Sequence, residues 1–336
     1  MPQEQALNNL PHQFSVAPMM DWTDRHCRAF HRQLTRHALL YTEMLTAGAV
    51  IHGDRDRLLG YSDAEHPVAL QLGGSEPQDM AEAARIGEAF GYDEININVG
   101  CPSDRVQSGR FGACLMAEPE TVASVFAAMQ KAVRIPVTVK CRIGIDDSNP
   151  ETGLDDFVDR VADAGCGTFI VHARKAWLKG LSPKENRDIP PLDYDRVHRL
   201  KARRPDLTIV INGGIETLED AKAHLAHVDG AMLGRAAFRH PGILAGVDPL
   251  FFDAQAPATD LREAVRAHLP YVEAMLAKGT RLSTIVKPMT GLFQSVPGAR
   301  RWRQILTVES VRLGAGIEVI EHALAAIGDS AEADAA

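Results

Sequence analysis

The stretch TIVINGG, from Thr208 to Gly214, is a short run of apolar and β-branched residues closed by an asparagine and two glycines. Such a run is typical of a strand that is buried on both faces of a parallel sheet. Seven other runs share this pattern: Phe14–Met19, Ala38–Met44, Pro67–Gly73, Glu94–Gly100, Pro136–Ile143, Thr168–Arg174 and Gly230–Arg235. The sequence therefore predicts eight strands.

Segments with helical spacing separate the predicted strands. Five of them are clear: Pro77–Phe90, Glu118–Val133, Leu154–Ala164, Tyr194–Arg203 and Thr217–His227. Strands that alternate with helices eight times predict a (β/α)8 TIM barrel. A doubly wound open sheet shows the same alternation and stays the alternative fold, because periodicity alone does not exclude it.

After Arg235 the chain shows helical spacing only. One apolar stripe consists of Leu261, Val265, Leu269, Val272 and Leu276. Two further helices are predicted at Arg300–Val311 and Ile317–Ile327. We therefore expect a catalytic barrel domain over residues 1–250 and a helical domain over residues 258–328.

Charge separates the two predicted domains. The whole chain of 336 residues has a net charge of −8, which does not indicate nucleic-acid binding. Between Asp260 and Glu321, however, nine Lys and Arg residues face six Asp and Glu residues. The helical part is therefore the basic part of an acidic protein, and it is the candidate surface for an anionic partner.

Composition limits the class of protein. Hydrophobic residues make up 45% of the chain and charged residues 24%, as in an ordinary globular protein. No apolar run approaches the roughly 20 residues that span a bilayer, and the first residues lack the features of a signal peptide. The five cysteines contain no CxxC pair, which argues against a disulfide framework or a metal site. We expect a cytoplasmic monomer without metal or membrane contact.

Polar side chains close nearly every predicted strand. In a barrel of this class the carboxyl ends of the strands form one mouth, where the chemistry takes place. That mouth collects Pro18, Met19, Glu43, Gln71, Asn98, Cys101, Lys140, Arg142, His172, Arg174, Asn212 and Arg235. Capping of strand ends is the structural alternative for such a set, but it does not explain why so many hydrogen-bonding groups converge.

Glycines follow the last two predicted strands. Asn212, Gly213 and Gly214 close the seventh strand, and Gly234 with Arg235 closes the eighth. Loops at these two places bind phosphate in many barrels, because bare backbone N–H groups and a helix N-terminus approach the oxygens. The two signals together predict a phosphorylated ligand.

Two mouth residues can take part in chemistry directly. An ammonium at Lys140 can neutralise negative charge that develops on an electron-rich ring such as a reduced flavin. Cys101 lies in a stiff loop, NVGCP, and a thiol with a reference pKa of about 8.5 can serve as a proton donor or a nucleophile. An ion-paired lysine and a buried inert cysteine are the alternative interpretations.

In seven motifs the sequence resembles the tRNA-dihydrouridine synthases, flavoenzymes that reduce a uracil ring in transfer RNA. The motifs are APMMDWTD (Ala17–Asp24), QLGG (Gln71–Gly74), NINVGCP (Asn96–Pro102), SGRFGACLM (Ser108–Met116), VKCRIG (Val139–Gly144), VHAR (Val171–Arg174) and NGGI (Asn212–Ile215). The resemblance extends from about Phe14 to Ile320. The segment His172–Arg187 with the following IPPLDY resembles the A-type subfamily, which implies that uridines 20 and 20a of the D-loop are the targets.

The resemblance also implies roles for individual residues. The FMN cofactor would be bound by Ala17, Pro18, Met19, Gln71, Lys140, His172, Asn212, Gly213, Gly214, Gly234 and Arg235. NADPH would reduce the flavin, and uracil would receive a hydride at C6 from flavin N5 and a proton at C5 from Cys101, the general acid. Asn98 would touch the target nucleotide.

Basic residues outside the mouth are candidates for contacts with the RNA backbone. Arg300 and Arg303 lie one helical turn apart, and Lys184 and Arg187 lie on a long loop of the barrel. The expected tRNA contacts are Asn98, Arg174, Lys184, Arg187, Arg300 and Arg303. A solvated charged face is the alternative for the arginines.

Two other functions stay open at this point. A small-molecule flavin reductase of the dihydroorotate dehydrogenase or old-yellow-enzyme type explains the mouth equally well, but it does not explain the basic helical domain. An RNA-binding protein on a barrel scaffold without chemistry is the second alternative, because fold does not determine function. A yellow preparation would exclude the latter.

Overall fold

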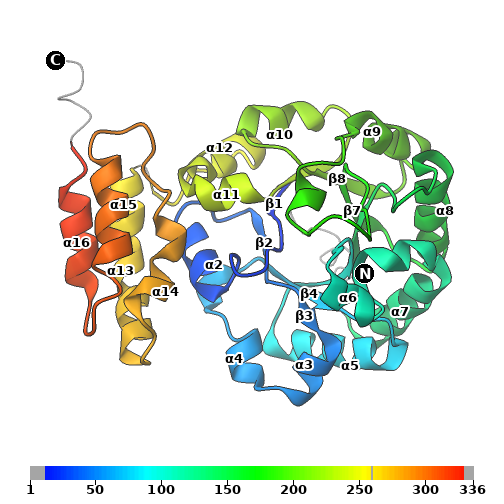
Figure 1. Ribbon diagram of the computed structural model, residues 1–336, viewed down its shortest axis with the longest axis horizontal. Helices are drawn as coiled ribbons and strands as arrows, with labels where there is room; N and C mark the ends of the chain where they lie inside the picture. Colours follow the sequence, from blue (N-terminus) through cyan, green and yellow to red (C-terminus); the bar gives the residue numbers. More distant parts are fainter. Residues whose placement is uncertain (1–11, 259, 329–336) are drawn as a thin grey trace. The chain divides into compact units, whose positions relative to one another are not determined.

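A closed parallel barrel forms the larger part of the structure, a computed structural model that describes residues 12–258 and 260–328 apart from the side chain of Arg105. Its strands are β1 (Phe14–Val16), β2 (Leu39–Tyr41), β4 (Val68–Gly73), β5 (Glu94–Val99), β6 (Val137–Arg142), β7 (Thr168–His172), β8 (Thr208–Asn212) and β9 (Gly230–Leu233). They pair in the order β2-β1-β9-β8-β7-β6-β5-β4, and β2 also pairs with β4, which closes the ring (Figure 1). The prediction of a (β/α)8 TIM barrel is confirmed, and the open sheet is excluded.

All eight predicted strands are present. All of them except β4 end before the last residue of the predicted run, because that residue already belongs to the loop. Glu94 begins β5 and Asn98 lies near its end, so the strand carries polar side chains over its whole length. One short additional strand, β3 (Leu45–Thr46), pairs with β4 in parallel.

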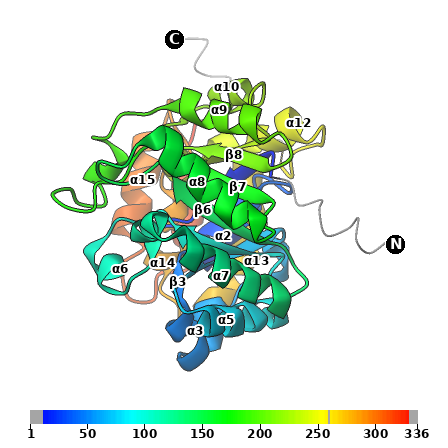
Figure 2. The same cartoon turned by 90° about the vertical axis from the view of Figure 1, so that its right-hand side faces the viewer.

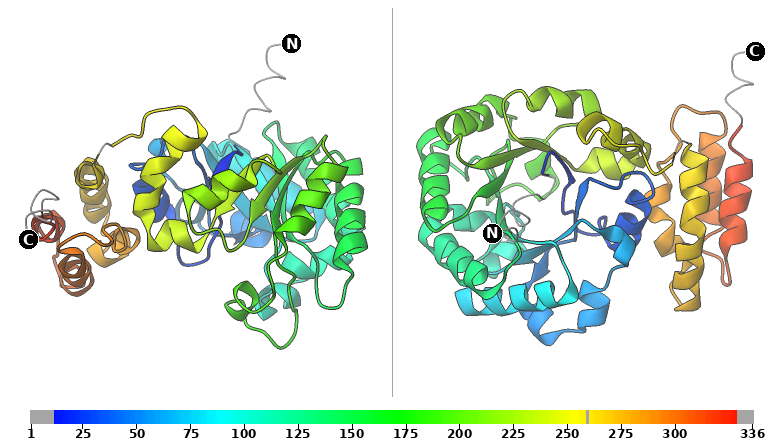
Figure 3. Two further views of the ribbon diagram at one scale, coloured as in Figure 1. Left: turned by 90° about the horizontal axis from the view of Figure 1, so that it is seen from above. Right: turned by 180° about the vertical axis from the view of Figure 1, so that it is seen from behind.

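Helices surround the barrel on its outside. In the same compact unit as the strands are α3 (Ala47–His52), α4 (Arg55–Leu59), α5 (Pro77–Phe90), α6 (Asp104–Ser108), α7 (Pro119–Ala132), α8 (Pro150–Asp163), α9 (Tyr194–Arg203) and α10 (Leu218–His224). Figure 2 shows α7 and α8 on the outside of the barrel, and the right view of Figure 3 shows the ring of strands from behind. Helices α5 and α9 have the predicted bounds.

A second compact unit collects segments that are distant in sequence. It consists of Met20–His37, Tyr61–Glu65 and the chain from Arg235 onward, and the remaining segments form the barrel unit. Its helices are α2 (Arg25–His31), α11 (Arg235–Arg239), α12 (Val247–Phe251), α13 (Leu261–Ala277), α14 (Leu282–Ile285), α15 (Ala299–Val308) and α16 (Ile317–Ala325). The expected division into residues 1–250 and 258–328 stays a prediction.

The buried face of α13 shares Val265 and Val272 with the predicted stripe but differs from it elsewhere. The buried side chains are Ala264, Val265, His268, Val272 and Met275. Leu269 and Leu276 are only partly buried. His268 is completely buried, and it packs against the rings of Phe30 and Tyr271. None of the described helices is long and apolar enough to cross a lipid bilayer.

Candidate functional site

The loop after β5 holds Cys101 through its backbone. The N–H group of Cys101 donates to Oδ1 of Asn98 at 3.0 Å, and the N–H group of Gly100 donates to the same oxygen at 3.2 Å. The carbonyl of Cys101 accepts from the N–H group of Ala113 at 2.9 Å. The half-buried thiol lies 3.6 Å from Oγ of Ser103. The loop therefore fixes the sulfur at the mouth of the barrel.

Gly112 allows a second segment to pass close beneath this loop. Its φ angle is +75°, and a Cβ atom there would lie 2.6 Å from the carbonyl oxygen of Cys101. Only glycine combines this left-handed backbone with such a close approach. The motif SGRFGACLM thus supports the cysteine loop, a function that its sequence alone did not reveal.

A buried chain of hydrogen bonds runs along the interior of the barrel to Asn98. Thr138 donates to Oε1 of Glu94 at 2.6 Å, and Asn96 donates to Oγ1 of Thr138 at 2.8 Å. Gln71 donates to Oδ1 of Asn96 at 2.7 Å, and Asn98 donates to Oε1 of Gln71 at 2.8 Å. All five side chains are at most 8% exposed. The chain thus connects the start of β5 to the cysteine loop.

Glu94, at the other end of this hydrogen-bond network, has two further partners. Tyr41 donates to Oε1 at 2.7 Å, and Nε2 of His12 lies 2.8 Å from Oε2. Burial raises the pKa of Tyr41, and the adjacent carboxylate raises it further, so its hydroxyl stays a donor. Buried polar groups are costly unless they are satisfied, and this network satisfies them in series.

Lys140 projects from β6 into the same mouth. Its Nζ atom donates to Oδ1 of Asn212 at 3.0 Å, and Nδ2 of Asn212 donates to the carbonyl of Met232 at 2.8 Å. Burial, helped by the nearby charge of Arg142, lowers the pKa of Lys140 to about 8. Within the described residues, the hydrogen-bond partner of the ammonium is thus a neutral amide, which leaves its charge available to an anion.

The glycine loop after β8 has a left-handed backbone at both glycines. Gly213 and Gly214 have φ angles of +111° and +69°. A Cβ atom on Gly213 would lie 2.7 Å from Nε2 of His172, and one on Gly214 would lie 2.5 Å from Cδ1 of Leu192. Tyr194 donates to the carbonyl of Gly213 at 2.8 Å, which fixes the turn.

Gly234 differs from these two glycines. A Cβ atom there would have its nearest neighbours, Met19 and Ala17, at 3.8 and 3.9 Å. Packing within the protein therefore does not demand a glycine, and the position leaves room for a ligand. Arg235 follows in sequence and begins α11, in the second unit.

The segment after β1 lines the mouth from another strand. Ala17 is buried and donates its N–H to the carbonyl of Leu233 at 2.8 Å. Pro18 and Met19 are half-buried, and Met19 packs against the apolar layer inside the barrel. Within the barrel unit, the structure brings together at one end of the strands the predicted site residues Ala17, Pro18, Met19, Gln71, Asn98, Cys101, Lys140, His172, Asn212, Gly213, Gly214 and Gly234.

Arg142 has a structural function that the sequence did not reveal. Its Nε atom donates to the carbonyl of Gly100 at 2.9 Å. Its Nη1 atom donates to the carbonyls of Lys175 at 3.0 Å and Asn186 at 2.9 Å. Burial, together with the charges of Arg187 and Arg174, lowers the pKa of Arg142 to about 10. One buried guanidinium thus joins the cysteine loop to the long loop after β7.

That long loop presents the predicted basic residues of the barrel. Lys184 and Arg187 are exposed around the short helical turn Glu185–Arg187. Arg174 is half-buried, and its Nη1 atom donates to the carbonyl of Pro190. The loop is held by Asn186, whose buried amide accepts from and donates to the backbone of Trp177 at 2.7 and 2.9 Å. Lys184 and Arg187 therefore stand on an ordered segment.

In the second unit, α15 carries the other predicted RNA contacts. Arg300 and Arg303 are exposed, and Trp302 between them is completely buried. The indole N–H of Trp302 donates to the carbonyl of Met289 at 3.0 Å. The buried indole fixes which face of the helix displays the arginines.

Comparisons with known proteins agree on one family. A family model described as dihydrouridine synthase (Dus) matches residues 15–327. The chain is 58% identical over 318 residues to the tRNA-dihydrouridine(20/20a) synthase of Yersinia pestis, covering 94% of this chain and 92% of that protein. It is 59% identical over 317 residues to the protein of the same name from Escherichia coli strain K12, with the same two coverages.

A solved structure shows the same architecture at a much greater distance. A 2-naphthoyl-CoA reductase in complex with 2-naphthoyl-CoA aligns with a TM-score of 0.55 and 10% sequence identity. The alignment covers 70% of this chain and 50% of that one. At this identity the likeness shows the fold alone.

Proposed function

The chain belongs to the dihydrouridine synthase family and reduces uridine in tRNA to dihydrouridine, and from this premise we propose its target positions, cofactors and site residues. The proposed targets are uridines 20 and 20a of the D-loop, because the relatives with 58–59% identity are named for those positions. The family is flavin-dependent; the proposed flavin is FMN and the proposed reductant is NADPH. An enzyme of tRNA is expected in the cytoplasm.

The residues at the barrel mouth fit FMN. The left-handed backbone at Gly213 and Gly214 exposes N–H groups of the kind that bind phosphate, and the space at Gly234 is free of other protein atoms within 3.8 Å. Lys140, whose hydrogen-bond partner within the described residues is a neutral amide, suits the electron-rich side of a flavin. The bound flavin would supply hydride-transfer chemistry. The proposed contacts are Ala17, Pro18, Met19, Gln71, Lys140, His172, Asn212, Gly213, Gly214, Gly234 and Arg235.

Cys101 is the proposed general acid. Its S–H bond breaks as a C–H bond forms at C5 of the uracil, and the thiolate regains a proton from solvent. The observation that carries this assignment is the backbone anchorage of Cys101 by Asn98 and Ala113, which holds one half-buried thiol at the mouth. Anchorage of this kind keeps the donor within reach of a bound base.

The tRNA contacts follow from charge and exposure. The target base is stacked within folded tRNA and must leave the stack to reach the barrel. Asn98 and Arg174 are proposed to touch the extruded nucleotide, and the exposed residues Lys184, Arg187, Arg300 and Arg303 are proposed to bind phosphates.

The test is direct. Unmodified tRNA is incubated with the protein, FMN and NADPH, and dihydrouridine is located by mass analysis of nuclease fragments. We expect dihydrouridine at positions 20 and 20a and nowhere else. A preparation that cannot be reconstituted with FMN contradicts the cofactor, and product at other positions contradicts the proposed specificity. Dihydroorotate as a substrate in place of tRNA would favour the small-molecule alternative.

A further inference from the structure

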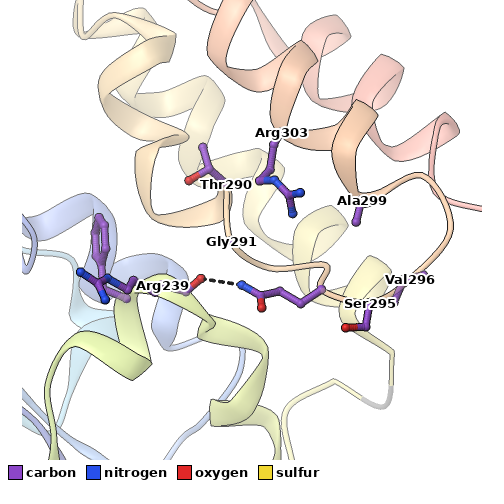
Figure 4. A pocket seen from close by; sticks show the side chains of 9 residues that line it. Arg239, Thr290, Gly291, Ser295, Val296, Ala299 and Arg303 are labelled. Atoms are coloured by element: carbon purple, nitrogen blue, oxygen red, sulfur yellow. Dashed lines mark hydrogen bonds between the residues drawn. The ribbon is translucent and has the colours of Figure 1, made fainter. Parts of the chain in front are cut away.

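A hollow in the second unit contains polar and positively charged side chains. Its volume is about 600 Å³, and it lies where α11, the loop after Met289 and the start of α15 meet (Figure 4). The lining residues that matter here are Phe238, Arg239, Thr290, Gln294, Ser295 and Arg303. Pockets of roughly 300–1,000 Å³ hold small ligands, so the hollow has room for one nucleotide.

The charged residues that line the hollow are all positive. Arg239 and Arg303 are both exposed, and the residues that line the hollow include no carboxylate. Within residues 12–258 and 260–328 neither guanidinium forms an ion pair. The side chain of Arg303 points toward the loop that contains Ser295 (Figure 4). Unpaired guanidinium groups of this kind favour phosphate.

One side of the hollow is formed by a backbone approach and a side-chain hydrogen bond. Nε2 of Gln294 donates to the backbone carbonyl of Arg239 at 3.1 Å, which holds the amide in place. A Cβ atom on Gly291 would clash with the same carbonyl, so the two backbones touch there. Ser295 has a φ angle of +56°. The amide of Gln294 and the hydroxyls of Thr290 and Ser295 are suited to hydrogen bonds with a sugar or a base edge.

Phe238, which lines the hollow, belongs to a stack of flat groups that extends away from it. The rings of Trp22 and Phe238 stack with centroids 4.6 Å apart and planes 16° apart. The guanidinium of Arg239 lies over the ring of Trp22, 5.9 Å from its centroid. Unpaired bases in RNA are bound by such surfaces, because every base can stack on an aromatic ring or a guanidinium plane.

We propose that this hollow, the nucleotide pocket, binds one unpaired nucleotide of a tRNA loop, with its phosphate on the guanidinium of Arg303. The proposal rests on the proposed tRNA function and adds a second RNA site, separate from the site of the target uridine. Arg300 lies one turn from Arg303 on the same exposed face, so the positive charge of the protein extends beyond the pocket. This arrangement favours a polyanion such as RNA over a single phosphate ion.

The experiment separates occupancy of the pocket from surface charge. Binding of tRNA to the FMN-loaded full-length protein is measured at several KCl concentrations for Arg303→Gln, for the pocket-filling variant Thr290→Phe and for the double variant. Arg301→Gln, on the same helix but outside the pocket, and Thr284→Phe, at an exposed position of α14, are the matched controls. Dihydrouridine formation by the unchanged protein is measured in parallel.

We expect Arg303→Gln to weaken binding about fivefold at low salt and to lower the salt slope by roughly one unit, the value for one phosphate contact. Thr290→Phe removes no charge, but it should lower the slope equally because it excludes the nucleotide. The double variant should bind no more weakly than the weaker single variant. Combined with Arg301→Gln, the effect of Thr290→Phe should instead be additive.

Two results would contradict the proposal that this pocket binds a nucleotide. One is a Thr290→Phe protein with unchanged affinity and slope; the other is additive loss in the double variant. Gln294→Phe, which fills the same space from an exposed position, replaces Thr290→Phe if that protein does not fold. A failure of the proposed function looks different, because the unchanged protein then forms no dihydrouridine whatever the variants do to binding.

Discussion

Asn98 accepts a hydrogen bond from the backbone N–H of Cys101 at 3.0 Å, while its own amide donates to Gln71 at 2.8 Å. The amide therefore connects the cysteine loop to the buried polar network of the barrel. A change deep in the barrel, at a residue that never meets the substrate, is expected to reach the proposed acid through this connection.

The first prediction concerns Cys101. Cys101→Ala should keep FMN binding and oxidation of NADPH but lose dihydrouridine formation by about 10²–10⁴-fold, the usual contribution of a general acid. Single-turnover formation of dihydrouridine in tRNA measures this loss. Cys114→Ala is the matched control, because Cys114 is also half-buried but its thiol donates to the carbonyl of Phe111. Normal turnover by Cys101→Ala would remove the thiol from the mechanism.

The second prediction concerns the buried network. Thr138→Val deletes the hydroxyl that joins Glu94 to Asn96. The buried amide donor of Asn96 then loses its acceptor, and Oε1 of Glu94 keeps only the donor Tyr41. We expect the free energy of unfolding to fall by about 1–3 kcal/mol, measured by urea denaturation. Thr168→Val, at the half-buried start of β7, should change it little. Equal free energies of unfolding for both variants would show that the hydrogen bonds of Thr138 do not stabilise the protein.

The third prediction concerns Lys140. Because its pKa is lowered to about 8, the unliganded protein loses this charge as the pH rises above that value. Anionic FMN favours the charged lysine, so FMN affinity should fall above pH 8. Lys140→Met should bind FMN more weakly at pH 7 and show no such fall. Lys175→Met, whose ammonium donates to the carbonyl of Ser148, should behave as the unchanged protein does in a fluorescence titration.

Lys140 also makes the free energy of unfolding depend on pH. Its folded-state pKa lies below the unfolded value, so between about pH 8 and 10.5 the unfolded chain binds more protons than the folded one. The penalty for burying the charge is complete below pH 8 and disappears as the pH rises through that range. FMN-free protein should therefore gain stability from this group in alkaline buffer, and Lys140→Met should not.

The fourth prediction concerns two buried histidines of the second unit. Burial lowers the pKa of both His31 and His268 to about 3, so both are neutral in the folded protein. Below pH 6.5 the unfolded chain takes up protons that the folded chain does not, and each histidine then costs about 1.4 kcal/mol of stability per pH unit. Urea denaturation at pH 7 and pH 5 measures the loss.

His268→Phe should remove about half of the loss of stability at low pH that His31 and His268 cause together. Within the described residues neither ring nitrogen of His268 has a hydrogen-bond partner, and its neighbours Phe30 and Tyr271 are aromatic. A phenyl ring therefore suits the place, and His322→Phe, at a half-exposed position, serves as the control. An unchanged difference between pH 7 and pH 5 in His268→Phe would contradict the assignment.

Local patterns were enough to predict the barrel. Buried parallel strands such as Thr208–Asn212 are continuous apolar runs, and the helices Pro77–Phe90 and Tyr194–Arg203 are long enough to show their period. Short helices such as α2, α11 and α14 have too few turns for a period to appear. The expected stripe on α13 was wrong in part, because an alanine, a histidine and a methionine take the place of three leucines in the buried face.

The candidate site was predictable only where a residue type indicates its chemistry. Glycines, a lysine and a cysteine at strand ends indicate a phosphate, an anion and a proton. Arg142, Asn186 and Gly112 gave no such signal, because their functions depend on backbone groups that are distant in sequence. Which carbonyl a guanidinium meets is determined by the folded chain and not by its neighbours in sequence.

The attachment of Arg142 to the carbonyls of Gly100, Lys175 and Asn186 limits how this enzyme can be re-engineered. A designer who grafts a foreign segment between residues 175 and 187 to change RNA preference also replaces two of the three acceptors of that guanidinium. Such a chimera will keep its catalytic rate only if the new segment returns a carbonyl to the place of Asn186. Specificity and rate in this scaffold are therefore not independent design variables.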